Sequence, residues 1–166
     1  MKHLLLVCLS AIVGFASFGQ SDKEDIDMVQ AIYGKAKKEI VADFIKMPDS
    51  LKGASFWKLY DSYETERKAL GQQRLALLQK YANAYTNMDD KTTEDIMKQT
   101  MSLQKKVDGL IVSYYDKIKK SVGATQAGQF YQLESYLLSA TRMYILGNIP
   151  FIGELEKMAP PPPAAK

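Results

Sequence analysis

Apolar side chains recur every three or four residues along four stretches of the chain, and this spacing is typical of amphipathic helices. The first stretch covers residues 22–46. Pro48 ends it, because the residue before a proline is disfavoured in the helical region. Asp49 or Ser50 can cap the next helix by accepting a backbone N–H bond. The apolar stripe of this first predicted helix consists of Ile26, Val29, Tyr33, Ala36, Ile40 and Phe44.

The second and third stretches predict two long helices joined by a polar turn. The second covers residues 50–88 and would be roughly 55 Å long at 1.5 Å per residue. In the turn NMDDKTTED, Thr92 and Asp95 resemble a capping box for the third helix. The third helix runs to about residue 120, and Gly123 is a natural C-terminal cap. The expected core positions of the second helix are Phe56, Leu59, Tyr63, Leu70, Leu77, Tyr81 and Met88.

The fourth stretch, residues 124–146, is apolar on more than one side. Such a helix is either central in a bundle or covered by a partner. Gly147 and Pro150 end it. One face carries Phe130, Leu133, Leu137, Ala140 and Tyr144, and further apolar residues are Leu138, Met143 and Ile145.

These patterns predict an all-α protein, a four-helix antiparallel arrangement with a long central helical hairpin. No stretch shows the alternation of a half-buried strand. Residues 20–156 are enough for one helical domain with its own core. Residues 157–166 include a run of prolines and predict an extended, disordered tail.

The N-terminal residues have the layout of a secretory signal peptide. Lys2 precedes an apolar run that ends in small residues, and cleavage after Gly19 would remove residues 1–19 and leave Gln20 first. The apolar run is short for a membrane anchor. A lipidated Cys8 and an uncleaved anchor remain as alternatives. We therefore expect export, with the mature protein in the periplasm or outside the cell.

Cleavage would remove the only histidine, His3, and the only cysteine, Cys8, and would lower the net charge from +3 to +2. The mature chain would then lack an imidazole base, a thiolate nucleophile and the usual nitrogen and sulfur metal ligands. We expect no enzyme activity, no metal and no cofactor. A net charge near zero also argues against nucleic-acid binding. Lysine pairs on the third helix allow a weak contact with an anionic membrane surface.

Charged and aromatic residues of the second and fourth helices lie three or four residues apart, on adjoining helical faces. One interpretation is a structural polar layer, in which arginines pack along their stems and pair with carboxylates. A second is a concave, mixed-charge surface that holds a partner. A third, a hydrolase with two carboxylates, lacks any sign that these face each other across a cleft. The predicted polar layer consists of Tyr63, Glu64, Arg67, Arg74, Glu134 and Arg142.

All ten tyrosines lie after the predicted signal peptide. Tyrosine is common in adaptable binding surfaces, because its ring is apolar and its hydroxyl is polar. Most of these tyrosines fall on core stripes, but three do not. The candidate partner-binding residues are Tyr115, Tyr131 and Tyr136, with Leu138 beside them.

The segments FWKLYDSYETERKALGQQRLALLQKYANAY, LQKKVDGLIVSYYDKIKK and VGATQAGQFYQLESYL carry a resemblance to known proteins. Over roughly residues 49–155 the chain resembles exported bacterial helical proteins that are distantly similar to the periplasmic Spy/CpxP (LTxxQ) family. The matching features are the aromatic residues from Phe56 to Tyr63, the spacing of Arg67 and Arg74, and the segment 129–134. Of the family's L-T-x-x-Q signature only Gln126 remains.

The resemblance implies a long helical hairpin with flanking helices, often paired as a cradle-shaped homodimer that holds unfolded client proteins. Metal sensing in that family relies on histidines, which the mature chain lacks. We therefore expect an exported, non-enzymatic protein that binds polypeptide partners, chaperone-like or acting in envelope stress. The alternative is an envelope scaffold domain with one dedicated partner.

Overall fold

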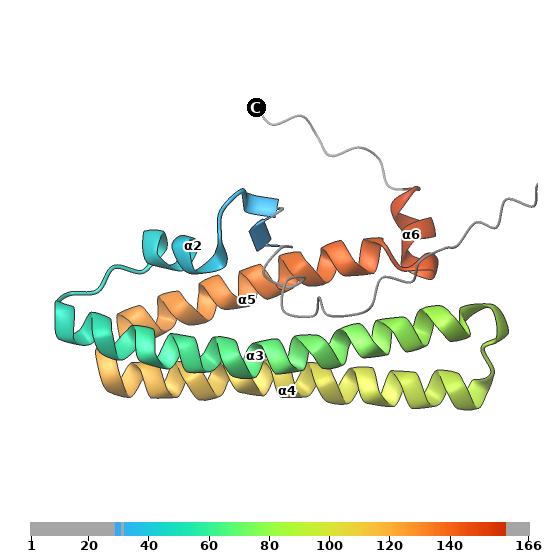
Figure 1. The fold of residues 1–166 in the computed structure, drawn as a ribbon, viewed down its shortest axis with the longest axis horizontal. Coiled ribbons are helices and arrows are strands. Elements are labelled where there is room, and N and C mark those ends of the chain that lie inside the picture. Colours follow the sequence, from blue (N-terminus) through green and yellow to red (C-terminus); the bar gives the residue numbers. More distant parts are fainter. Residues whose placement is uncertain (1–28, 31, 159–166) are drawn as a thin grey trace, which may run out of the picture.

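The computed structural model describes residues 29–30 and 32–158, and the regular secondary structure of these residues is entirely helical (Figure 1). The prediction of an all-α protein is confirmed. The predicted signal peptide and most of the proline-rich tail lie outside the described residues. The elements are α2 (Lys37–Phe44), α3 (Ser50–Ala84), a 3-10 turn (Tyr85–Asn87), α4 (Asp90–Val122), α5 (Ala124–Gly147) and α6 (Pro150–Glu156).

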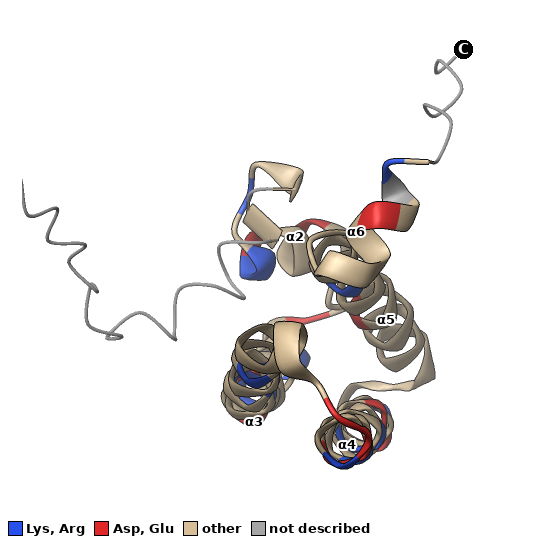
Figure 2. Cartoon of the chain, turned by 90° about the vertical axis from the view of Figure 1, so that its right-hand side faces the viewer, with Lys and Arg blue, Asp and Glu red and all other residues tan. Residues whose placement is uncertain are grey.

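Helices α3 and α4 form the long antiparallel hairpin expected from the sequence, and α5 packs antiparallel to α4. Seen end-on, the three helices occupy the corners of a triangle (Figure 2). The short helices α2 and α6 contact α5 near opposite ends of the bundle (Figure 1). Within the described residues, no helix is both long and apolar enough to cross a membrane.

Local side-chain chemistry explains where the long helices begin and end. Asp49 caps α3 by accepting the backbone N–H of Lys52 at 2.8 Å, and Asp89 caps α4 by accepting that of Thr92 at 2.7 Å. The predicted capping box of Thr92 and Asp95 is therefore wrong, because Asp89 takes the capping position. Gly123, at φ 114°, ends α4 and directly precedes α5.

The predicted first helix differs most from the structure. Residues 22–28 lie outside the described part of the chain, and the rest is not one continuous helix. The backbone turns at Gly34, whose φ of 67° belongs to the left-handed region that glycine tolerates. Helix α2 then starts afresh at Lys37 and ends at Phe44.

The main core lies between the N-terminal half of α3, the C-terminal half of α4, the N-terminal half of α5 and α2. Phe130 of α5 packs edge-to-face on Tyr63 of α3, with ring centroids 5.1 Å apart, and Tyr114 of α4 lies 5.4 Å from Tyr63. Beyond Arg67, α3 has no fully buried side chain. The expected core positions Leu70, Leu77, Tyr81 and Met88 are only half-buried, and Tyr60 replaces Leu59 at the centre. The other fully or nearly fully buried core residues are Val41, Ile45, Phe56, Ile111, Ile118, Val122 and Ala127.

Candidate functional site

Six polar side chains from three helices meet inside this core, and we call them the buried charge cluster. Four of them carry a formal charge, two positive and two negative. Glu134 is the most enclosed, with a side chain only 1% exposed. The cluster consists of Lys37 of α2, Tyr60, Tyr63, Glu64 and Arg67 of α3, and Glu134 of α5.

Helical spacing brings these residues together. The four from α3 lie at positions i, i+3, i+4 and i+7, which is one face of a helix. Glu134 interrupts the buried stripe of α5 between Phe130 and Leu137. Lys37 lies in the first turn of α2, on the same side as the buried Ile40 and Val41. Helices α2 and α5 therefore each turn one charged residue inward within an otherwise apolar face, and α3 turns four polar side chains toward them.

Glu134 accepts hydrogen bonds from three side chains. Its Oε2 atom lies 2.6 Å from Lys37 Nζ and 2.9 Å from the Tyr63 hydroxyl. The Tyr60 hydroxyl donates to Oε1 at 3.3 Å. A buried carboxylate is strongly destabilising unless it is paired and hydrogen-bonded. Both oxygens of Glu134 meet that requirement.

Glu64 connects Lys37 to Arg67. Its Oε1 atom accepts from Lys37 Nζ at 2.7 Å and from Arg67 Nε at 2.8 Å, and Arg67 Nη2 reaches Oε2 at 3.2 Å. The guanidinium thus binds the carboxylate in the two-point manner that favours arginine over lysine. Lys37 lies between the two carboxylates, and the four formal charges cancel.

This environment controls the protonation of the cluster. Burial alone would raise the pKa of Glu64, but Lys37 and Arg67 outweigh it and lower the pKa to about 2. Burial, reinforced by the negative charge of Glu134, raises the pKa of Tyr60 and Tyr63 far above the usual tyrosine value. Both tyrosines therefore stay neutral and act as hydrogen-bond donors.

The arrangement is suited to holding helices together. Within the described residues, no buried side-chain nitrogen or oxygen lacks a hydrogen-bond partner. Lys37 bridges Glu64 and Glu134 and occupies the space between the two carboxylates. Glu66, outside the cluster, accepts from the Tyr114 hydroxyl at 2.6 Å. Among the described residues, no three His, Cys, Asp or Glu side chains are grouped to hold a metal ion.

Four of the six residues predicted for the polar layer meet in this cluster: Tyr63, Glu64, Arg67 and Glu134. The other two, Arg74 and Arg142, line a separate cleft between α3, α4 and α5 that contains none of the cluster residues. Arg74 and Arg142 lie seven and eight residues beyond Arg67 and Glu134, about two turns along their helices.

Sequence reasoning missed Lys37 and left Tyr60 out of the polar layer. Both had a signal. Tyr60 lies three and four residues before Tyr63 and Glu64, on their face of the helix. Lys37 lies three residues before Ile40, which places it on the apolar side of its helix.

The four candidate partner-binding residues do not share one surface. Tyr115 and Tyr131 pack edge-to-face across α4 and α5 with ring centroids 6.0 Å apart. Tyr136 is exposed and lies about 140° further around α5, where its ring centroid is 6.5 Å from that of Tyr33. Leu138 is half-buried and packs against the main core.

A different set of apolar side chains is exposed at the C-terminal end of α5 and on α6, and we call it the α5–α6 apolar surface. In α6 and just after it, Phe151 is 70% exposed, Leu155 62% and Met158 81%. The spacing of four residues places Phe151 and Leu155 on one side of this short helix, and Met158 lies in the turn that follows it. The full set is Met143, Tyr144, Phe151, Leu155 and Met158.

Comparison of the chain with protein-family models, with curated proteins and with solved structures found no match. The similarity to Spy/CpxP proteins stays an expectation from sequence. We infer the function from the charges, contacts and exposed surfaces described above.

Proposed function

We propose that this protein is exported, has no enzyme activity and binds polypeptides through the α5–α6 apolar surface. The observation that carries the proposal is the exposed apolar side of α6. Water-exposed groups of large apolar side chains on a soluble protein commonly mark interaction sites. Two of the five side chains are methionines, whose flexible thioethers adapt to varied partners.

The buried charge cluster supports a binding role more than a catalytic one. Its ionisable groups neutralise one another inside the core, and the lysine that joins them blocks the space between the carboxylates. The proposal therefore assigns stability to the cluster and recognition to the exposed surface. The resemblance to client-holding Spy/CpxP proteins agrees with this division.

The test is light scattering from a chemically denatured, unrelated protein diluted into buffer with the chain from Gln20 onward. We expect suppression of aggregation near equimolar ratios. The double substitution Phe151→Ser with Leu155→Ser should abolish it. The matched control is Leu51→Ser, because Leu51 is 81% exposed but lies in the first turn of α3. Aggregation that continues at large molar excess of the protein would refute client holding.

A second candidate is a scaffold domain with one dedicated envelope partner. The confinement of the apolar surface to the C-terminal end of α5, to α6 and to the residues just after α6 favours it, because a client-holding protein gains from a broader surface. Its signature is no effect on unrelated clients together with one saturable partner, bound at a fixed ratio. That binding should fail in the Phe151→Ser, Leu155→Ser variant and persist in Leu51→Ser.

A homodimer is part of the same proposal, and the resemblance is its support. The finer arrangement, two copies of the helical unit forming a cradle, is tested by sedimentation equilibrium at micromolar concentration. We expect twice the mass of the chain. A single-chain mass would remove the cradle and leave the binding surface of one molecule.

A further inference from the structure

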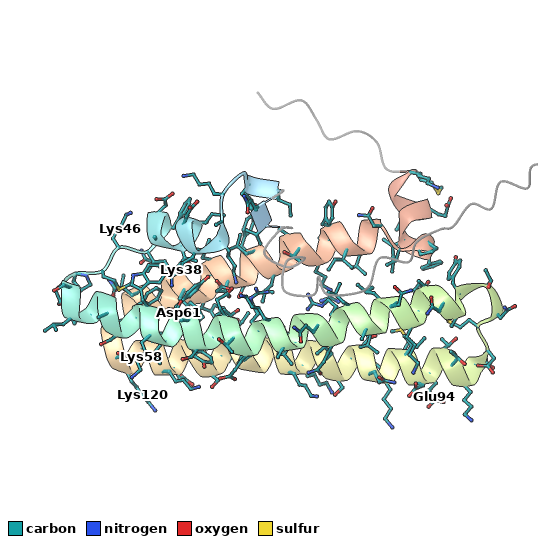
Figure 3. All side chains as sticks on the ribbon, viewed as in Figure 1. Lys38, Lys46, Lys58, Asp61, Glu94 and Lys120 are labelled. Atoms are coloured by element: carbon teal, nitrogen blue, oxygen red, sulfur yellow. The ribbon has the colours of Figure 1, made fainter. Side chains whose placement is uncertain are left out.

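Three elements meet at one end of the bundle, where α2 ends, α3 begins and α4 passes into α5 (Figure 1). This end consists of residues 44–52 and 116–125, and we call it the lysine-rich end. Gln126 Nε2 of α5 lies 3.5 Å from the backbone oxygen of Lys46, in the connector between α2 and α3. Lys46 and Lys120 accordingly lie at the same end of the molecule (Figure 3).

Positive charge is concentrated at the lysine-rich end. Five lysines and two aspartates give it a net charge of +3, as large as the formal charge of the entire sequence. All five lysines are exposed, and none forms an ion pair with another described residue. One donates to a backbone carbonyl of α2 and two lie over neighbouring tyrosine rings, contacts that leave the charge uncancelled. The lysines are Lys46, Lys52, Lys117, Lys119 and Lys120.

Two large apolar side chains are exposed at the same end. Phe44, the last residue of α2, is 69% exposed, and Leu51, in the first turn of α3, is 81% exposed. They flank the short connector that contains Lys46. Covering large apolar side chains with a nonpolar partner is favourable, because it removes their surface from water. The lysine-rich end therefore combines positive charge with two apolar side chains that a partner can cover.

This combination fits the surface of an anionic lipid bilayer. Phenylalanine and leucine insert at the boundary between headgroups and acyl chains, while lysines reach the lipid phosphates on flexible stems. A nucleic acid offers phosphates but no acyl layer for Phe44 and Leu51. At the α5–α6 apolar surface, by contrast, Lys157 is already paired with Glu154 at 2.7 Å. Charge complementarity therefore favours the lysine-rich end as the lipid-facing end.

We propose that the lysine-rich end docks reversibly on an anionic lipid bilayer, with Phe44 and Leu51 inserted between the headgroups and the five lysines on the lipid phosphates. The α5–α6 apolar surface lies toward the other end of α5, whose 24 residues span about 36 Å at 1.5 Å per residue. Docking in this way leaves that surface away from the membrane. The inference goes beyond polypeptide binding and does not depend on it.

The experiment is co-sedimentation of the chain from Gln20 onward with vesicles of equal parts phosphatidylglycerol and phosphatidylcholine. Vesicles of phosphatidylcholine alone are the matched probe. We expect at least tenfold tighter binding to the anionic vesicles, because each lysine near the surface is attracted to them. Raising the salt from about 0.1 M to about 1 M shortens the screening length from about 10 Å to about 3 Å and should release the protein. Equal binding to both vesicles, or no binding at millimolar lipid, would overturn the inference.

Lysine substitutions locate the contact. Lys119→Gln with Lys120→Gln should weaken binding to the anionic vesicles at least tenfold. Lys105→Gln with Lys106→Gln is the matched control, because this exposed pair changes the net charge equally but lies roughly 20 Å back along α4. Circular dichroism should show the same helix content for both variants, since all four lysines are exposed. An equal loss in the two variants would reduce the effect to overall charge and contradict the proposal.

Serine substitutions test the apolar part. Phe44→Ser with Leu51→Ser should weaken vesicle binding at least tenfold and keep the suppression of aggregation. Phe151→Ser with Leu155→Ser is the matched control, because it removes the same two side-chain types from another exposed site. This control should bind vesicles like the wild type. The reverse pattern would assign the lipid contact to the α5–α6 apolar surface and refute the proposal. Vesicle binding by a protein that never suppresses aggregation would uphold the lysine-rich end and refute client holding alone.

A lipid surface differs from other polyanions in its acyl chains. Labelled polyglutamate, at the same concentration of negative charge, should bind at least tenfold more weakly than the anionic vesicles, because it offers nothing to cover Phe44 and Leu51. Polyglutamate binding as tight as vesicle binding would indicate a site for acidic polypeptides and refute lipid recognition.

Discussion

Lys37 illustrates, at the scale of one residue, how a buried charge is kept in a small helical protein. Its Nζ atom lies 2.6 Å from Glu134 and 2.7 Å from Glu64. Removing an ammonium group from water costs several kcal/mol, and close partners offset this only when every remaining polar atom is satisfied. That condition holds in the buried charge cluster. Removing any one of its members would leave a buried charge without its partner, and this would destabilise the fold.

Replacing Lys37 should therefore be costly. We expect Lys37→Met to lower the free energy of unfolding by about 3–5 kcal/mol, because two buried carboxylates would remain with one arginine. The neighbouring Lys38 is the control: it pairs with Asp61 at 2.5 Å on the surface, where both side chains are more than half exposed (Figure 3). Lys38→Met should cost less than about 1 kcal/mol. Urea unfolding measures both, and equal losses would contradict a buried role for Lys37.

The low pKa of Glu64 predicts a pH dependence of stability. In the unfolded chain its pKa is near 4.5, and in the folded protein it is about 2. The folded value is the lower one, so Glu64 stabilises fully above pH 4.5 and loses this contribution as the pH falls toward 2. The amount is on the order of 3 kcal/mol.

Urea unfolding at several pH values between 6 and 2 measures this contribution. Glu64→Gln should be less stable at pH 6 and should show a flatter decline below pH 4.5. Glu94→Gln is the matched control, because Glu94 is exposed on α4 (Figure 3). Parallel curves for the wild type and Glu64→Gln would show that Glu64 does not carry the effect.

At the scale of elements, sequence signals succeeded where the chemistry is local. Gly123 was predicted as a cap, and Asp49 as one of two candidates with Ser50, because capping depends on residues within one turn. The start of α4 was placed at Thr92 instead of Asp89, because several residues of this polar turn can cap. The break at Gly34 could not be predicted the same way. Gly71, Gly109 and Gly128 lie inside helices, so a glycine within a helical pattern does not by itself indicate a break.

Glycine also decides how closely α6 returns to α5. A Cβ atom at Gly153 would lie 3.0 Å from the backbone oxygen of Gly147, whereas at Gly109 it would meet nothing within 4 Å. Gly109→Ala should therefore stabilise the protein by about 1 kcal/mol through helix propensity. Gly153→Ala should gain less than this or lose stability, because α6 must shift. Thermal unfolding of the two variants tests this, and an equal gain in both would argue against close packing of α6.

At the scale of the whole molecule, the sequence predicts which face of each helix is apolar but not which faces meet. The grouping of Tyr63, Glu64 and Arg67 with Glu134 was predicted correctly, because each of these residues lies beside the apolar stripe of its helix. Lys37 was missed although its spacing to Ile40 places it on the apolar side, because the stripe expected for residues 22–46 took the neighbouring Ala36 instead. Arg74 and Arg142 were grouped with the wrong partners, since helical periodicity does not determine how far along the bundle two residues meet.

The concentration of buried side chains in the first half of α3 has a consequence for how the molecule opens. Backbone amides near Tyr60 and Tyr63 should exchange with deuterium only when the whole chain unfolds. Amides beyond Arg67, where α3 has no fully buried side chain, should exchange through smaller openings of the hairpin tip. Native-state exchange would then resolve two cooperative units in one domain, with the tip of α3 and α4 separating and closing again while the clustered charges stay in place.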